Sequence, residues 1–116
     1  PERMASGASA LDFHALAAMT FEAMDAHGHP ERFPGLKLAW ETLRGAPGSC
    51  ALLNAANEIS VEAFLNRQIR FDQIHVVNRA TLDRITSSAP HTLEDLLDLD
   101  RRGREAAKSI VRKLVV

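Results

Sequence analysis

Two histidines separated by one glycine are the first residues in the chain whose types could hold a metal ion. His27 and His29 stand on either side of Gly28, and the carboxylates of Asp25 and Glu31 lie within a few residues of them. Imidazole and carboxylate groups are ordinary ligands of zinc and related divalent cations. The glycine and the proline that follows the second histidine are, however, typical of a polar surface loop. We interpret the segment as a solvated loop, with a small metal-binding protein as the alternative.

Three polar residues share one side of a helix that we expect in the middle of the chain. Asn54, Asn57 and Glu58 are spaced i, i+3 and i+4, which places them on one helical face. Alanines between them would let another backbone approach closely. Because buried amides and carboxylates need hydrogen-bond partners, the face is either the polar lining of a pocket or a hydrogen-bonded contact with another segment or domain. We favour the second interpretation and treat these residues as a candidate interdomain contact.

The last predicted helix carries a row of cations that could bind phosphate. The row consists of Arg101, Arg104, Lys108 and Arg112. The carboxylates of Asp98, Asp100 and Glu105 counter this charge near the helix start, and no aromatic residue is interleaved for base stacking. A solvated face with cations toward the helix C-terminus explains the same pattern. We therefore expect no nucleic-acid partner.

Catalytic and cofactor motifs are missing from the chain. It contains no GxGxxG, GxxxxGK[ST], HExxH or paired CxxC sequence. Cys50 is the only cysteine, and without a recognisable histidine partner we predict that it is a small packing residue. We assign no catalytic, cofactor-binding or metal-binding residue to the chain.

Length and composition limit the class of protein. The chain has 116 residues, enough for one domain with a real core, and 46% of them are apolar. The net charge of −1 does not favour nucleic acid or an acidic membrane, and no apolar run approaches the roughly 20 residues that cross a bilayer. With one cysteine and no signal segment, we expect a cytoplasmic location. The first residue is Pro1 rather than methionine, which favours a fragment.

The pattern of residues 34–116 predicts an all-α fold, a compact bundle of about four helices. Pro34 suits a first helical turn, and we expect the inward face of that helix to include Trp40 as a core residue. After a Gly- and Pro-rich break, Ser49 is the predicted N-cap of a second helix. Asn66 is its predicted end, because asparagine tolerates the left-handed conformation.

Two further helices complete the predicted bundle. Asp72 is the expected cap of the third, whose inward residues are Ile74, Val77, Thr81 and Ile85. Thr92 and Asp95 resemble a capping box, after which we expect a short turn and then a separate long helix. The turn contains Leu93, Leu96 and Leu97, and the long helix carries Ala106, Ala107, Ile110, Val111 and Leu114.

Residues 1–33 differ from the rest and predict an extended, largely irregular arm, or linker. Met19, Thr20 and Phe21 could form a short strand, but a lone strand is unstable in water and the chain offers it no partner. We expect the arm to wrap the following domain or another one. The predicted division is therefore a linker over 1–33 and a C-terminal helical bundle domain over 34–116.

Several short segments, taken in order, resemble one enzyme family. The most unusual is Leu53-Asn54-Ala55-Ala56-Asn57-Glu58. The others are Pro1–Gly7, Leu11-Asp12-Phe13, Thr20-Phe21-Glu22, Arg32-Phe33-Pro34, Leu36, Leu38, Ala39, Ala63-Phe64-Leu65 and Ile69-Arg70-Phe71. Over nearly its whole length the chain is similar to the C-terminal part of 1-deoxy-D-xylulose 5-phosphate reductoisomerase.

The resemblance implies a role within a larger enzyme. That enzyme is a homodimer that isomerises and reduces 1-deoxy-D-xylulose 5-phosphate to 2-C-methyl-D-erythritol 4-phosphate, in the non-mevalonate route to isoprenoids. It uses NADPH and a divalent cation, magnesium or manganese. The family's metal, substrate and cofactor ligands precede the part that this chain matches. The resemblance therefore implies a non-catalytic helical domain whose partners are the other domains of the same enzyme.

The sequence departs from the family pattern near the two histidines. Asp25 lacks the proline that often precedes it in the family, the stretch 26–31 is longer than usual, and Gly35 replaces a common cysteine. These differences argue against a family metal site at His27 and His29. The alternative to the reductoisomerase domain is a freestanding helical protein-interaction module.

Overall fold

The described part of the chain is built from helices. The computed structural model describes residues 12–20, 23, 29–86 and 89–114, and no strand occurs among them. The elements are α1 (His29–Arg32), α2 (Pro34–Leu43), α3 (Ser49–Leu65), the 3-10 helix η1 (Phe71–Gln73), α4 (Ile74–Arg84) and α5 (Leu93–Leu114). The prediction of an all-α bundle of about four main helices is confirmed.

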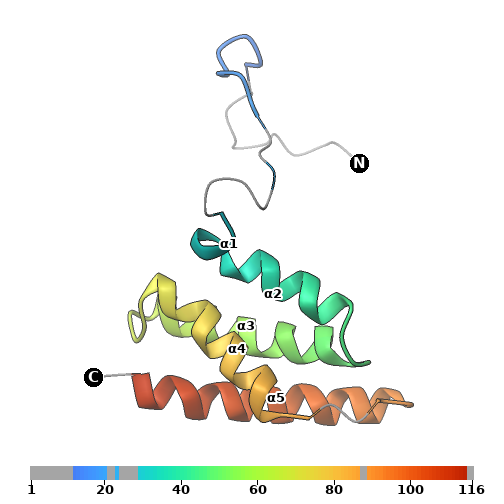
Figure 1. Ribbon diagram of the computed structural model, residues 1–116. Coiled ribbons are helices and arrows are strands. Elements are labelled where there is room, and N and C mark those ends of the chain that lie inside the picture. The colour runs from blue at the N-terminus through green and yellow to red at the C-terminus, as the bar shows by residue number, and fades with distance from the viewer. Residues whose placement is uncertain (1–11, 21–22, 24–28, 87–88, 115–116) are drawn as a thin grey trace, which may run out of the picture.

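Helix α3 occupies the middle of the bundle. It contacts α2, α4 and α5, and α4 also contacts α5. Figure 1 shows α2 on one side of α3 and α5 along the opposite side. Six buried residues on α3 serve these contacts: Leu52, Ala55, Ala56, Ile59, Ser60 and Ala63. Because half of them are alanines, neighbouring helices can approach α3 closely.

The core lies where α3, α4 and α5 meet. Its buried cluster consists of Ala56, Ile59, Ala63, Ile69, Val77, Ala107 and Val111. Burying one large aliphatic side chain contributes about 1.5–3 kcal/mol, so the isoleucines and valines of this cluster favour the contact among the three helices. Among the residues predicted to face inward on the third helix, Val77 and Thr81 are fully buried. Ile74 and Ile85 are only partly buried.

Trp40 is not a core residue, contrary to the sequence-based prediction. Its exposed fraction is 44%, whereas Leu38 and Thr42 on the other side of α2 are buried. Apolar residues occupy both sides of α2, and the pattern alone did not distinguish them. Contact with α3 selects the side that carries Leu38. Cys50 was also predicted to be packed, but it is exposed near the start of α3.

Glycine and arginine in the left-handed region mark the two ends of α3. Gly48, not Ser49, is the N-cap, with a φ of 86° that glycine adopts without strain. Helix α3 ends at Leu65 and Asn66 is the C-cap, as expected, but the left-handed residue is Arg67 with a φ of 59°. The Arg67 and Gln68 amides donate to the carbonyls of Phe64 and Ala63, which is the Schellman pattern.

Replacing Arg67 with glycine is expected to stabilise the domain by about 0.5–1 kcal/mol, because glycine adopts the left-handed conformation without the steric cost of a Cβ. The matched control is Arg112→Gly inside α5, where glycine should destabilise by about 1 kcal/mol. Urea unfolding of both variants measures the two effects. A loss of stability in Arg67→Gly would contradict this account of the α3 end.

Helix α5 is continuous, whereas the sequence predicted a short turn before it. The capping box is present: the Asp95 amide donates to Thr92 Oγ1 at 3.1 Å, and the Thr92 amide donates to Asp95 Oδ2 at 3.0 Å. The helix therefore begins at Leu93 and runs to Leu114. Ion pairs from Arg101 to Asp98 and Glu105 then span the region where a break was expected.

Asp72 does not cap the third helix, contrary to the sequence-based prediction, but forms an ion pair with Arg70. Asp72 lies inside η1, and its carboxylate accepts two hydrogen bonds from the Arg70 guanidinium, at 2.9 and 2.6 Å. The Arg70 amide donates to Gln73 Oε1 at 2.8 Å. This short element leads the chain directly into α4.

The described part of the arm has no helix or strand between residues 12 and 20. A turn there is closed by the Ala15 amide, which donates to the Asp12 carbonyl at 3.1 Å. Phe13 and Met19 are each 77% exposed. Phe21 lies outside the described residues, and the arm's role and the division at residue 33 stay predictions.

Candidate functional site

The three predicted contact residues lie on α3, as expected, and their side chains reach two different helices. Asn57 faces α4: its Oδ1 accepts a hydrogen bond from Asn78 Nδ2 at 3.0 Å. Glu58 faces α5, where its Oε2 accepts a hydrogen bond from Arg104 Nη2 at 2.7 Å. Asn54 donates to Glu58 Oε1 at 3.0 Å. All three are exposed in the domain, and their contact with another domain remains a prediction.

A buried polar network joins α3 to α4. Ser60 and Asn78 are 0% and 5% exposed, and the Ser60 hydroxyl lies 3.0 Å from Asn78 Oδ1. The same hydroxyl lies 3.0 Å from the carbonyl of Asn57. Every buried side-chain polar atom that the structure describes has a hydrogen-bond partner. The network therefore fixes the register of the two helices without leaving a free group for chemistry.

Sequence reasoning missed Ser60 and Asn78. The signal for Asn78 was its spacing, since it falls four residues after Ile74 and three before Thr81, on the inward face of α4. A polar residue at such a position needs a partner, and Asn57 was the available amide on the neighbouring helix. Ser60 carried no comparable signal, because serine is common on any helix face.

A second polar cluster joins α3 to α5 through Arg104. Its guanidinium donates to both carboxylate oxygens of Asp100, at 2.7 and 3.2 Å, in addition to Glu58. The hydrogen bond from Arg104, followed by that from Asn54, holds the pKa of the Glu58 carboxyl below its usual value. One residue of the row of cations on α5 is therefore committed to an internal contact. Arg101 is likewise paired, with Asp98 and Glu105.

The depressed pKa of Glu58 gives a testable pH dependence. Because its folded pKa lies below its unfolded value, the pairing stabilises the fold above the ordinary carboxyl pKa of about 4.3 and is lost as the pH falls through the folded value. We expect Glu58→Gln to weaken the fall in stability between pH 5 and pH 3, measured by urea unfolding. Glu62→Gln, at an exposed position of the same helix, is the control. Identical pH profiles for Glu58→Gln and the unchanged chain would contradict the expectation.

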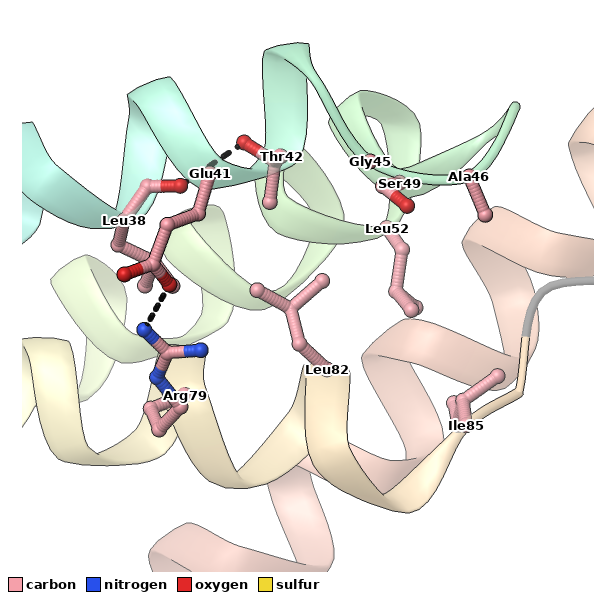
Figure 2. A pocket seen from close by; sticks show the side chains of 10 residues that line it. All are labelled: Leu38, Glu41, Thr42, Gly45, Ala46, Ser49, Leu52, Arg79, Leu82 and Ile85. Atoms are coloured by element: carbon pink, nitrogen blue, oxygen red, sulfur yellow. Dashed lines mark hydrogen bonds and ion pairs between the residues drawn. The ribbon is translucent and has the colours of Figure 1, made fainter.

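A crevice between α2, α3 and α4 is shown in Figure 2. Its volume is about 250 Å³, and its apolar walls include Leu38 from α2, Leu52 from α3 and Leu82 from α4. Its charged groups, Glu41 and Arg79, form an ion pair across the opening. The arrangement serves helix packing and does not present a reactive group.

Two adjoining grooves lie on the α2 side of the bundle. One, of about 450 Å³, is lined by Asn54, Asn57 and residues of α2 and α4. The other, of about 370 Å³, is lined mainly by apolar residues around Phe33, Leu36 and Phe71. Both include Gly35, Ile74 and His75. The candidate contact residues therefore border a partly apolar surface.

The metal hypothesis falls largely on residues that the structure does not describe. Asp25, His27 and Gly28 lie outside the described residues, and nothing is described of the side chain of His29. Within the described ranges, no group of three histidine, cysteine, aspartate or glutamate side chains is placed to hold a metal ion. None of the helices described there has the length and apolar character needed to cross a membrane.

Comparison with known proteins identifies a relative for almost the entire chain. Residues 1–106 match the family described as DXP reductoisomerase C-terminal domain. The structure is similar to that of 1-deoxy-D-xylulose 5-phosphate reductoisomerase from Zymomonas mobilis in complex with NADPH, with a TM-score of 0.77 and 41% sequence identity. The match covers 97% of this chain and 29% of that one, so the chain spans less than a third of the relative's length.

Proposed function

The chain belongs to the DXP reductoisomerase C-terminal domain family, and from this premise we propose that it is the non-catalytic helical domain of a complete reductoisomerase. The observation that carries the proposal is the family match over residues 1–106. The 41% identity with a solved reductoisomerase supports it. A freestanding interaction module is not favoured, because such a module would not be expected to match this enzyme domain over nearly its whole length.

The complete enzyme in this proposal rearranges and reduces 1-deoxy-D-xylulose 5-phosphate to 2-C-methyl-D-erythritol 4-phosphate. NADPH supplies the hydride, and a divalent cation, magnesium or manganese, assists the isomerisation. The proposed enzyme is a cytoplasmic homodimer whose other domains hold both groups. The solved relative is in complex with NADPH, which supports the choice of cofactor.

The described residues do not fit a cofactor or metal site. The chain has no glycine-rich GxGxxG loop to hold a pyrophosphate. The ion pair of Glu41 and Arg79 occupies the charged side of the crevice in Figure 2. We therefore derive no catalytic step on this chain. Its role is to pack on the catalytic part of the enzyme and to close one side of the active-site region.

Binding of NADPH separates the domain from the complete enzyme. We expect titration of NADPH to produce a fluorescence change with the complete enzyme and none with the 116-residue chain. The complete enzyme, in the same buffer with magnesium, is the positive control. Saturable binding by the 116-residue chain alone would refute its assignment as a domain without a cofactor site.

A further inference from the structure

One side of α2 carries a row of large apolar residues that the bundle does not cover. We call this row, Phe33, Leu36, Trp40 and Leu43, the α2 stripe. Their exposed fractions are 54%, 50%, 44% and 66%. The spacing of three, four and three residues places them along one line of the helix. Single exposed apolar residues are ordinary on a protein surface, but several in a row on one helix face indicate an interaction site.

The bundle holds α2 through its opposite side. Leu38 and Thr42 are buried against α3, and Glu41 reaches Arg79 of α4. The packing of α2 on the bundle therefore leaves about half of each α2 stripe side chain exposed.

Positive charge borders the α2 stripe. The Arg44 guanidinium lies 5.1 Å from the ring centre of Trp40, and that of Arg32 lies 5.5 Å from the ring centre of Phe33. Lys37, within α2, is a third exposed cation near the row. The carboxylate of Glu41 is paired with Arg79 on the inner side. Glu31 and Asp72 are the other carboxylates near the row, and Asp72 is paired with Arg70. A complementary surface would be apolar with carboxylates at its border.

A second group of exposed apolar residues, on α5, has a different setting. Leu93, Leu96 and Leu97 lie at the start of α5 and are also exposed. Glu94, Asp95 and Asp98 are interleaved with them, so this end of α5 is strongly acidic. Charged residues are depleted from the centres of protein interfaces, which favours the α2 stripe over this surface.

The path of the chain also points to the α2 side. In Figure 1 the described part of the arm lies on the side of α1 and α2, away from α5, and the chain enters α2 directly after Phe33. The chain matches only 29% of the solved relative, so most of that enzyme lies outside the matched part. A domain connected through the arm would reach α2 before any other long helix.

We propose that the α2 stripe is the surface through which this domain docks on the preceding part of the reductoisomerase. Its counterpart there is an apolar patch bordered by carboxylates. The proposal rests on the proposed function, because that function supplies the occupant. It adds an orientation, with α2 facing the rest of the enzyme and the charged face of α5 facing solvent.

Hydroxyl-radical footprinting read by mass spectrometry tests the orientation. In the complete enzyme, labelling of Trp40 and Leu43 should fall at least about fivefold relative to the 116-residue chain, because interface centres exclude water. Labelling of Leu93 and Leu97 should stay within about twofold, since that surface remains solvated. Equal labelling of Trp40 in both proteins, or protection of Leu97 instead, would overturn the proposal.

A pair of substitutions provides a second readout. Leu43→Glu in the complete enzyme should lower its melting temperature and raise the labelling of Trp40, whereas Leu97→Glu, at a similarly exposed leucine, should do neither.

Protection of Trp40 that appears in the 116-residue chain only at high concentration would show a second copy on the surface and overturn the named occupant. Turnover is measured separately. Its absence would reject the proposed function, while an unprotected Trp40 in an active enzyme would reject only the docking surface.

Discussion

Replacing Gly103 with valine is expected to lower the free energy of unfolding by about 3 kcal/mol, the upper range for overpacking a close contact. A Cβ at this position would lie 2.7 Å from Leu52 Cδ1 and 3.2 Å from Ala55 Cβ. Leu52 can turn its side chain, but it is itself 1% exposed, and Ala55 has no rotamer to change. The helices α3 and α5 would have to move apart, which would loosen the packing of the core between them. Chemical unfolding in urea measures the loss.

The matched control for this substitution is Gly35→Val in α2. A Cβ at Gly35 would meet no atom within 4 Å, so valine should change the stability by no more than about 0.5 kcal/mol through helix propensity. Equal stability losses for the two valine variants would show that the close approach of α3 and α5 is not what requires glycine at position 103.

Replacing Asn78 with alanine is expected to cost about 2–3 kcal/mol. Two hydrogen bonds between α3 and α4, to Asn57 and Ser60, are lost, at about 1 kcal/mol each. The remainder comes from the space left at a position that is 5% exposed. Thermal and urea unfolding of the purified domain provide the measurement.

Asn54→Ala is the same substitution at an exposed amide of α3. Asn54 donates a hydrogen bond to the exposed Glu58, so its removal should cost no more than about 0.5 kcal/mol. A loss of equal size in the two alanine variants would contradict the assignment of Asn78 as the polar link between α3 and α4.

The helices could be predicted from local signals, and so could some of their ends. Pro34 starts α2, and Thr92 with Asp95 forms the capping box before α5. These signals act within one turn of the helix, so they can be recognised without knowledge of the fold. The left-handed Arg67 had no such signal, because arginine is not a residue that favours this conformation.

The orientation of the helices could not be predicted equally well. Apolar residues lie on both sides of α2, and only contact with α3 decides that Leu38 is buried and Trp40 is not. The short turn predicted before the last long helix, with Leu93, Leu96 and Leu97, was wrong. These residues form the first turns of α5, which runs without interruption from Leu93 to Leu114.

The candidate contact residues were correctly placed on one helix, yet their partners depended on tertiary structure. Spacing located Asn54, Asn57 and Glu58 on α3 but not the helices that they face. Asn57 meets Asn78 and Glu58 meets Arg104, across sequence separations of 21 and 46 residues. Such long-range pairs cannot be deduced from periodicity within a single helix.

The most direct test of the central claim is an assay of NADPH oxidation with 1-deoxy-D-xylulose 5-phosphate and magnesium. It compares the 116-residue chain with a complete enzyme that contains these residues as its C-terminal domain. The account predicts substrate-dependent oxidation by the complete enzyme and none by the 116-residue chain at the same concentration. Turnover by the short chain alone, or no substrate-dependent oxidation by the complete enzyme, would contradict it.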